Sequence, residues 1–252
     1  MKCKQLTRLA LFLCIGCGDV QIKHAAFTST TPARYQKINQ LPLPAGYSRL
    51  QYPNGSFANW LQQLPLKKDK TVYLYNGIKK ANQAAQFAVL DISVGNQNLQ
   101  QCADAVMRLR AEYLFEHKKF DRIIFFDNNR KAYPFTTPFT RAHFDKYLLL
   151  VFGICGSASL EKQLRQQKMQ DINPGDVLIK GGFPGHAVIV TDVAINNKAN
   201  KIFMIAQSYM PAQDIHVLVN PANPQFPWYT AGTAKLIITP EYVFDAANLK
   251  SW

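Results

Sequence analysis

Residues 173–194, "NPGDVLIKGGFPGHAVIVTDVA", constrain the fold more than any other part of this chain. The apolar, β-branched runs at 176–180 and 186–194 are typical of strands, and the glycines and prolines between them are typical of a tight loop. The segment therefore predicts a β-hairpin whose second strand begins with a titratable side chain, His186. A half-exposed histidine at a strand end is the simplest interpretation unless another part of the chain supplies a partner.

The rest of the chain predicts helices early and strands late. We expect helices at 56–64, 96–117 and 144–167, the last broken at 153–156, and a closing helix at 239–249 capped by Thr239. We expect further strands at 71–77, 87–95, 121–128, 201–210, 214–220 and 233–239. Helices followed by an antiparallel sheet indicate the α+β class.

The N-terminus has the pattern of a secretory signal. Lys2, Lys4 and Arg8 precede a short apolar run, which is too short to span a bilayer. We therefore expect residues 1–16 to be a signal peptide and the mature protein to be exported.

The end of that signal, "LCIGC", resembles the lipobox of bacterial lipoproteins. The resemblance implies lipidation at Cys17 and a membrane-anchored protein of the bacterial cell envelope, whereas simple cleavage would release it. Residues 17–45 hold scattered prolines and few apolar runs, which indicates a tether. A single domain is expected over 46–252.

Composition narrows the class of partner. The chain has 252 residues, 48% of them hydrophobic, and a formal net charge of +13. Its basic residues are scattered and form no recognisable nucleic-acid module, so we expect no nucleic-acid partner. Attraction to an anionic envelope surface or polymer is one account of the charge, and a solvated basic face with no specific partner is the simpler one. Beyond Cys17 the cysteines are Cys102 and Cys155, too few for a disulfide scaffold, and residues 18–252 contain no CxxC or HExxH spacing that predicts a metal site.

Cys102 lies where the sequence predicts the start of a helix. Asn98 is a plausible N-cap with Gln101 three residues later, which places Cys102 in the first turns. Unpaired N–H groups and the positive end of the helix dipole favour a thiolate there. The alternative is a small core residue, because Cys102 shares helical spacing with Val106, Leu109 and Tyr113.

A cysteine on a helix N-terminus, followed by strands opening with "GD" and "GH", resembles the papain-like cell-wall amidases of the NlpC and CHAP branches. The resemblance implies a papain-like fold with no cofactor, in which Cys102 is the nucleophile, His186 is its base and Gln207 orients the imidazole. The oxyanion would be held by the Cys102 N–H and a side-chain donor, Gln97 or Gln101. The expected substrate is a peptide amide of the cell wall.

Four longer blocks resemble one family more closely. These are "YPNGSFANWLQQLPLK", "LQQCADAVMRLRAEYL", "GDVLIKGGFPGHAVIVTDVA" and "AQSYMPAQDIHVL", and they are similar to the family called domain of unknown function 4846. That family name supplies no activity. A non-catalytic envelope protein that uses the same fold for binding or structure is therefore the alternative, and the neutral Gln207 favours it.

Three other assignments stay open from the sequence. Cys155 follows an apolar run and is a second candidate nucleophile, although such surroundings raise a thiol pKa. His216 alternates with Ile215 and Val217 in a strand and is a stand-in for the orienting group. Arg108 and Arg110, on the helix after Cys102, either pair with nearby carboxylates or bind a carboxylate of the substrate.

Overall fold

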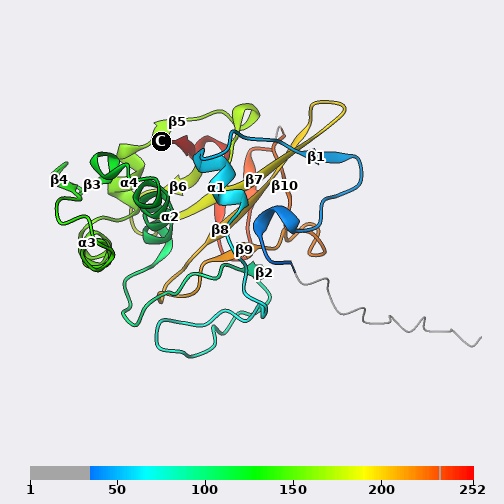
Figure 1. Ribbon diagram of the computed structural model, residues 1–252. Helices are drawn as coiled ribbons and strands as arrows, with labels where there is room; N and C mark the ends of the chain where they lie inside the picture. Colours follow the sequence, from blue (N-terminus) through cyan, green and yellow to red (C-terminus); the bar gives the residue numbers. More distant parts are fainter. Residues whose placement is uncertain (1–34, 233) are drawn as a thin grey trace, which may run out of the picture. The chain divides into compact units, whose positions relative to one another are not determined.

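The computed structural model describes residues 35–232 and 234–252, and its main feature is a nine-stranded antiparallel sheet (Figure 1). Seven strands follow the order β2-β9-β8-β7-β6-β13-β5, while β1 pairs with β7 and β10 pairs with β8. The strands are β1 (Tyr47–Arg49), β2 (Gln86–Val89), β5 (Arg165–Gln166), β6 (Val177–Lys180), β7 (His186–Asn196), β8 (Lys201–Gln207), β9 (His216–Leu218), β10 (Tyr229–Thr230) and β13 (Leu249–Ser251).

Four α-helices and two small hairpins complete the described fold. The helices are α1 (Phe57–Gln62), α2 (Cys102–Glu116), α3 (Arg141–Ile154) and α4 (Ser157–Gln163). The hairpins pair β3 (Ile124–Phe126) with β4 (Ala132–Pro134) and β11 (Leu236–Ile238) with β12 (Val243–Asp245). The α+β class expected from the sequence is confirmed.

The β6–β7 hairpin is confirmed and forms the middle of the sheet. Its register pairs Lys180 with His186, so the loop is residues 181–185. Glycine is required at 185, because a Cβ there would lie 2.4 Å from the Ser157 hydroxyl oxygen. The loop that precedes His186 is thus packed tightly against the start of α4.

A β-bulge sets which side chains of β7 and β8 share a face. Val193 is opposite Phe203, but the register shifts between Val190 and Asp192, and Ile189 is opposite Ala206. Without that shift Gln207 would be opposite Ile189 rather than Val188. Because neighbouring residues of a strand point to opposite faces, the bulge puts Gln207 on the same face as His186.

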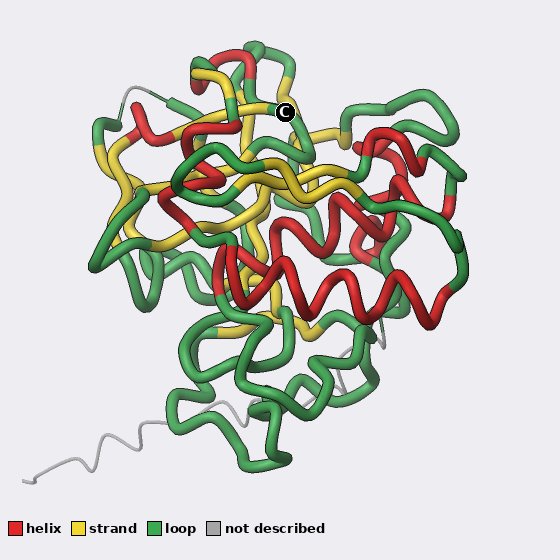
Figure 2. Tube along the Cα trace, turned by 90° about the vertical axis from the view of Figure 1, so that its left-hand side faces the viewer, coloured by secondary structure: helices red, strands yellow, loops and turns green. Residues whose placement is uncertain are grey.

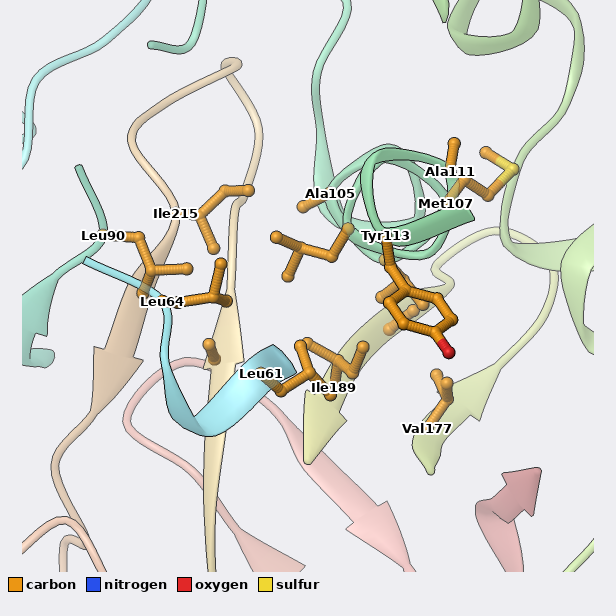
Figure 3. Close-up of a cluster of buried hydrophobic side chains, with 14 of the residues drawn as sticks. Leu61, Leu64, Leu90, Ala105, Met107, Ala111, Tyr113, Val177, Ile189 and Ile215 are labelled. Carbon is orange, nitrogen blue, oxygen red and sulfur yellow. The ribbon is translucent and has the colours of Figure 1, made fainter. Parts of the chain in front are cut away.

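Both faces of the central strands are buried, which explains the nearly continuous apolar sequence of β7. Ala187 and Ile189 belong to a core that includes α2, whereas Val188 and Val190 belong to a second core. Figure 3 shows the first core, where side chains of α2 meet β-strand residues and α1. The second core is closed by residues of β11, β12 and β13.

Helix α2 lies against β7 and β8 and carries the larger core. Its buried side chains include Val106, Leu109 and Tyr113, as the helical spacing predicts. Helix α3 contacts α2, and the two long helical segments lie together beside the strands in Figure 2. This packing fixes the N-terminus of α2 relative to the end of the sheet.

The described fold begins earlier than the expected boundary at residue 46. Ile38 and Leu41 are buried in the main core, and the Leu66 N–H donates to the Gln36 carbonyl. Residues 36–45 are therefore integrated into the domain. The proposed signal peptide and Cys17 lie outside the described residues. Within residues 35–232 and 234–252, no helix is long and apolar enough to cross a bilayer.

The closing helix expected at 239–249 is wrong. The Thr239 hydroxyl does accept the Tyr242 N–H at 3.0 Å, the bond of a helix cap, but here it closes the turn between β11 and β12. Phe244 is buried between exposed Val243 and Asp245, a two-residue period that suits a strand. Tertiary burial of Phe244 therefore overrides the capping signal.

Candidate functional site

His186 lies at the first position of β7, in an aromatic enclosure. Its ring centroid is 4.8 Å from that of Tyr209, 5.0 Å from Tyr242 and 5.8 Å from Phe244. Only 2% of the residue is exposed. Burial lowers the pKa of His186 to about 4, because the charged ring loses its hydration, and the imidazole is neutral near pH 7.

Gln207 holds one nitrogen of this ring. The Nε2 of His186 lies 2.8 Å from the Oε1 of Gln207. An amide oxygen only accepts, so this geometry requires a proton on Nε2 and leaves the lone pair on Nδ1. Among residues 35–232 and 234–252, no hydrogen bond engages Nδ1. The free nitrogen is the one that a catalytic base needs.

Two acceptors fix the orientation of the Gln207 amide. Its Nε2 donates to Glu241 Oε2 at 2.7 Å and lies 3.5 Å from His216 Nε2. His216 Nδ1 lies 2.9 Å from the Asp214 carbonyl oxygen and must donate to it, so His216 Nε2 carries a lone pair. A reversed amide would point its oxygen at both acceptors. Glu241 and His216 therefore turn that oxygen toward His186.

Lys80 and Glu241 form an ion pair behind Gln207. The two charged groups are 2.6 Å apart, and only 8% and 13% of their side chains are exposed. Burial lowers the pKa of Lys80, and the bond to Glu241 opposes this shift. The Glu241 carboxylate thus accepts from both the Lys80 ammonium and the Gln207 amide.

The sequence interpretation missed Lys80 and Glu241. They come from two segments without helical or strand periodicity, and their positions in the chain are 161 residues apart. The nearest local signal in the sequence is Thr239, two residues before Glu241. The sequence predicts a helix cap there, whereas the structure has a turn between two strands.

Cys102 is the first residue of α2, next to the strand that bears His186. The N–H groups of Ala103 and Ala187 point to its sulfur and lower the thiol pKa, but burial and nearby Asp104 outweigh them, so the pKa is raised overall. Cys102 also lies near Tyr209 and Tyr242, whose rings enclose His186. Cys102 therefore lies near the residue that follows His186 and near two rings of the His186 enclosure.

The start of α2 differs from the expectation in two respects. The N-cap is Gln101 rather than Asn98, and the Asn98 side chain instead accepts the Ala212 N–H at 2.8 Å. The thiolate expected from the helix N-terminus is not favoured, because burial dominates the pKa of Cys102. The pKa of the Cys102 thiol is raised and that of the His186 imidazole is lowered, so the neutral form of each group is favoured.

The two side-chain candidates for an oxyanion donor are placed differently. The Gln101 amide lies next to Cys102 in the chain and makes only long hydrogen bonds to Asn98, of 3.3 and 3.4 Å. Gln97 is exposed and lines a separate cavity with Arg108 and α3. Gln101 is therefore the better-placed donor beside the Cys102 N–H.

Cys155 is poorly suited to nucleophilic chemistry. It is buried at the end of α3, and burial raises the pKa of its thiol to about 11.

Arg108 pairs with a carboxylate of its own helix. Its partner is Glu112, which also pairs with Arg141, so the structural alternative holds for Arg108. In the described part of the chain, His, Cys, Asp and Glu side chains form no group of three arranged to hold a metal ion.

Comparison with known proteins places the chain in a family. A model of the family described as Domain of unknown function (4846), DUF4846, matches residues 38–140 and 126–251. No curated protein and no solved structure matches the chain. The two matched segments overlap and cover almost the entire described fold, including Cys102, His186, Gln207 and Glu241. This chain belongs to the DUF4846 family.

Proposed function

We propose that this protein is an exported cysteine amidase or peptidase with a papain-like arrangement of its α+β fold. The observation that carries the proposal is the His186 ring, whose Nε2 is fixed by Gln207 while Nδ1 has no hydrogen-bond partner among the described residues; the N–H of Ala187, the next residue, points to the Cys102 sulfur.

In the proposed reaction, the Cys102 sulfur attacks the carbonyl carbon of an amide while its proton passes to Nδ1 of His186. The negative oxygen of the tetrahedral intermediate accepts hydrogen bonds from the Cys102 N–H and the Gln101 amide. The imidazolium then protonates the leaving amine as the C–N bond breaks. Water hydrolyses the thioester, with His186 again serving as base, and the free thiol returns.

Gln207 and its acceptors support this assignment of roles. When His186 takes up a proton, both of its nitrogens carry hydrogen, and the Gln207 oxygen accepts one of them. Gln207 is neutral, but Glu241 places a negative charge on the far side of the amide at 2.7 Å. Glu241 raises the pKa of His186, against the larger effect of burial.

The substrate class and location are proposals from the resemblance to cell-wall amidases. We propose a peptide amide of the cell wall as substrate, and a membrane anchor through lipid at Cys17. Incubation of the mature protein with purified peptidoglycan fragments, followed by mass spectrometry, tests the activity. Cleavage by the wild type and by Cys155→Ala, but not by Cys102→Ala, is the expected result; cleavage by Cys102→Ala would exclude this nucleophile.

The second candidate is a non-catalytic binding module. It is favoured by the raised pKa of Cys102 together with the His186 pKa of about 4, because these values disfavour a thiolate–imidazolium pair. Failure of the wild type to cleave any fragment, combined with retention of a fragment on the immobilised protein, would support this module.

A further inference from the structure

Three arginines without acidic partners meet at a pocket more than two helical turns beyond Cys102. The pocket has a volume of about 180 Å³ and is lined by Arg110, Arg122, Arg165, Gln163 and Trp252, among others. Arg110 comes from α2, roughly 12 Å along the helix axis from Cys102. The pocket is therefore distinct from the proposed catalytic site.

Arg110 is half-buried and forms no hydrogen bond or ion pair within the described part of the chain. Its guanidinium carbon lies 4.8 Å from the Phe57 ring centroid, 5.3 Å from Trp252 and 5.7 Å from Tyr113. These aromatic faces offset part of the cost of burying the charge. They do not accept the in-plane N–H groups, and a guanidinium has five of them.

The described side chains that line the pocket include three arginines and no Asp or Glu. Arg122 and Arg165 are exposed at the same pocket, and none of the ion pairs among residues 35–232 and 234–252 includes any of the three. Burial and the charge of Arg122 lower the pKa of Arg110 to about 10, so it stays charged near neutral pH. The indole N–H of Trp252, in the same wall, also has no acceptor among the described residues.

Other arginines near α2 show how this fold normally treats a shielded cation. Arg108, two residues earlier on a different side of α2, pairs with Glu112, and Arg141 makes two bonds to Glu112 of 2.6 and 2.8 Å. Carboxylates are thus available where arginine serves a structural role. The pocket at Arg110 differs because no described Asp or Glu side chain pairs with its arginines, and clustered arginines of this kind suit an oxyanion.

We infer that Arg110, Arg122 and Arg165 form a binding site for a phosphoryl group. Three guanidinium charges match a dianionic phosphate better than a carboxylate with a single charge, and each can donate two parallel N–H bonds to phosphate oxygens. Arg110 supplies the preorganised contact, because aromatic rings hold its guanidinium. The exposed Arg122 and Arg165 close around the ligand. The inference does not depend on the proposed amidase activity.

Inorganic phosphate is the first probe, titrated into the full mature chain at low ionic strength while the indole ¹H–¹⁵N signals are followed by NMR. A saturable shift is expected for Trp252. Trp60 and Trp228 serve as internal references, since their indoles already donate to Glu116 and to the Pro42 carbonyl. Arg110→Met keeps most of the aliphatic packing and should weaken binding by about tenfold or more, the effect of losing charge-assisted bonds.

Two further variants are needed. One tests the site without disturbing a buried side chain, in case Arg110→Met fails to fold, and the other controls for the change in net charge. Arg165→Gln changes an exposed side chain and should also weaken binding. Lys198→Gln removes one positive charge from the turn after β7, away from the pocket residues, and should leave binding nearly unchanged. Equal weakening by Lys198→Gln would show a general charge effect and overturn the site.

Vesicles distinguish a free phosphate from a lipid headgroup. Flotation with phosphatidic acid vesicles, compared with phosphatidylcholine vesicles, is measured for the wild type and the same variants. Phosphate binding that needs Arg110 and Arg165 supports a soluble ligand, and phosphatidic acid binding with the same dependence supports a headgroup. Binding in neither arm, or binding that Arg110→Met and Arg165→Gln both leave intact, overturns the inference.

Discussion

The Nε2 of His186 lies 2.8 Å from the Oε1 of Gln207, although the two residues are 21 positions apart and on neighbouring strands. This contact fixes a tautomer, because the amide oxygen can only accept. It leaves Nδ1 as the basic nitrogen. The arrangement of Lys80, Glu241 and His216 behind the amide determines whether that oxygen faces the imidazole.

Removing the acceptor at residue 241 is expected to release the amide. The double variant Lys80→Met, Glu241→Met replaces a buried ion pair by apolar side chains and leaves no unpaired charge. Gln207 can then rotate, so a mixture of His186 tautomers is expected. Long-range ¹H–¹⁵N correlations of the ring measure the two tautomers directly.

The matched control is Lys80→Met with Glu241→Gln, which retains a carbonyl oxygen at the same position. This variant should keep the proton on Nε2. If the methionine double variant also keeps a single Nε2–H tautomer, Glu241 does not set the orientation of Gln207, and the acceptor at His216 is sufficient.

Cys102 and Cys155 are expected to differ in the rate at which their thiols react with an alkylating reagent. Iodoacetamide should modify Cys102 faster than Cys155, because Cys102 is half-exposed whereas Cys155 is buried with a pKa of about 11. Peptide mapping by mass spectrometry after timed quenching measures both rates. Equal, slow modification of both thiols in the folded protein would favour the binding module.

Cys102→Ala should abolish any amidase activity while lowering the free energy of unfolding by roughly 1 kcal/mol, because little volume is removed. Denaturant unfolding and activity on peptidoglycan fragments check the two effects separately. If the variant loses much more stability than this, Cys102 is a core residue, and a loss of activity would no longer show that it is the nucleophile.

His216 should make acid conditions destabilising. Burial lowers its pKa from 6.5 to about 3, so the unfolded chain binds a proton below pH 6.5 while the folded protein does not. The free energy of unfolding therefore falls with decreasing pH across this window, by up to about 1.4 kcal/mol per pH unit for this one proton.

The test compares His216→Asn with the wild type at each pH. The variant keeps a donor for the Asp214 carbonyl but has no titrating ring, so its stability relative to wild type should improve as the pH falls from 6.5 to 4. The comparison cancels the opposite effect of Asp104 and Asp176, whose pKa values burial raises to about 8 and 7. A difference independent of pH would contradict the assignment.

The loop before His186 should tolerate no side chain at residue 185. Gly185→Ala places a Cβ 2.3 Å from the Gly182 carbonyl oxygen and 2.4 Å from the Ser157 hydroxyl oxygen. Overpacking of this kind costs about 1–3 kcal/mol. Gly153→Ala is the control: in α3 a Cβ would meet nothing within 4 Å, and helix propensity should raise stability by up to about 1 kcal/mol. Thermal unfolding of both variants measures the contrast.

Local sequence determined the elements that carry the site. The alternation of turn residues with β-branched runs was sufficient to predict the β6–β7 hairpin, and the spacing of Val106, Leu109 and Tyr113 was sufficient to predict the buried side of α2. Both signals arise within a few residues of chain, because backbone preference and amphipathic period are local properties. The same reasoning failed at Thr239, where a capping bond closes a hairpin.

Only the tertiary structure decided which polar groups meet. Residues of three neighbouring strands supply His186, Gln207 and His216, while irregular segments supply Lys80 and Glu241. The bulge between Val190 and Asp192 is decisive for the first pair, because a register one residue different would turn Gln207 to the opposite face. The sequence of a strand shows which side chains alternate between the two faces of the sheet. Which set lies on which face depends on how the strand pairs with its neighbours, and this register is set by the packing of the entire sheet.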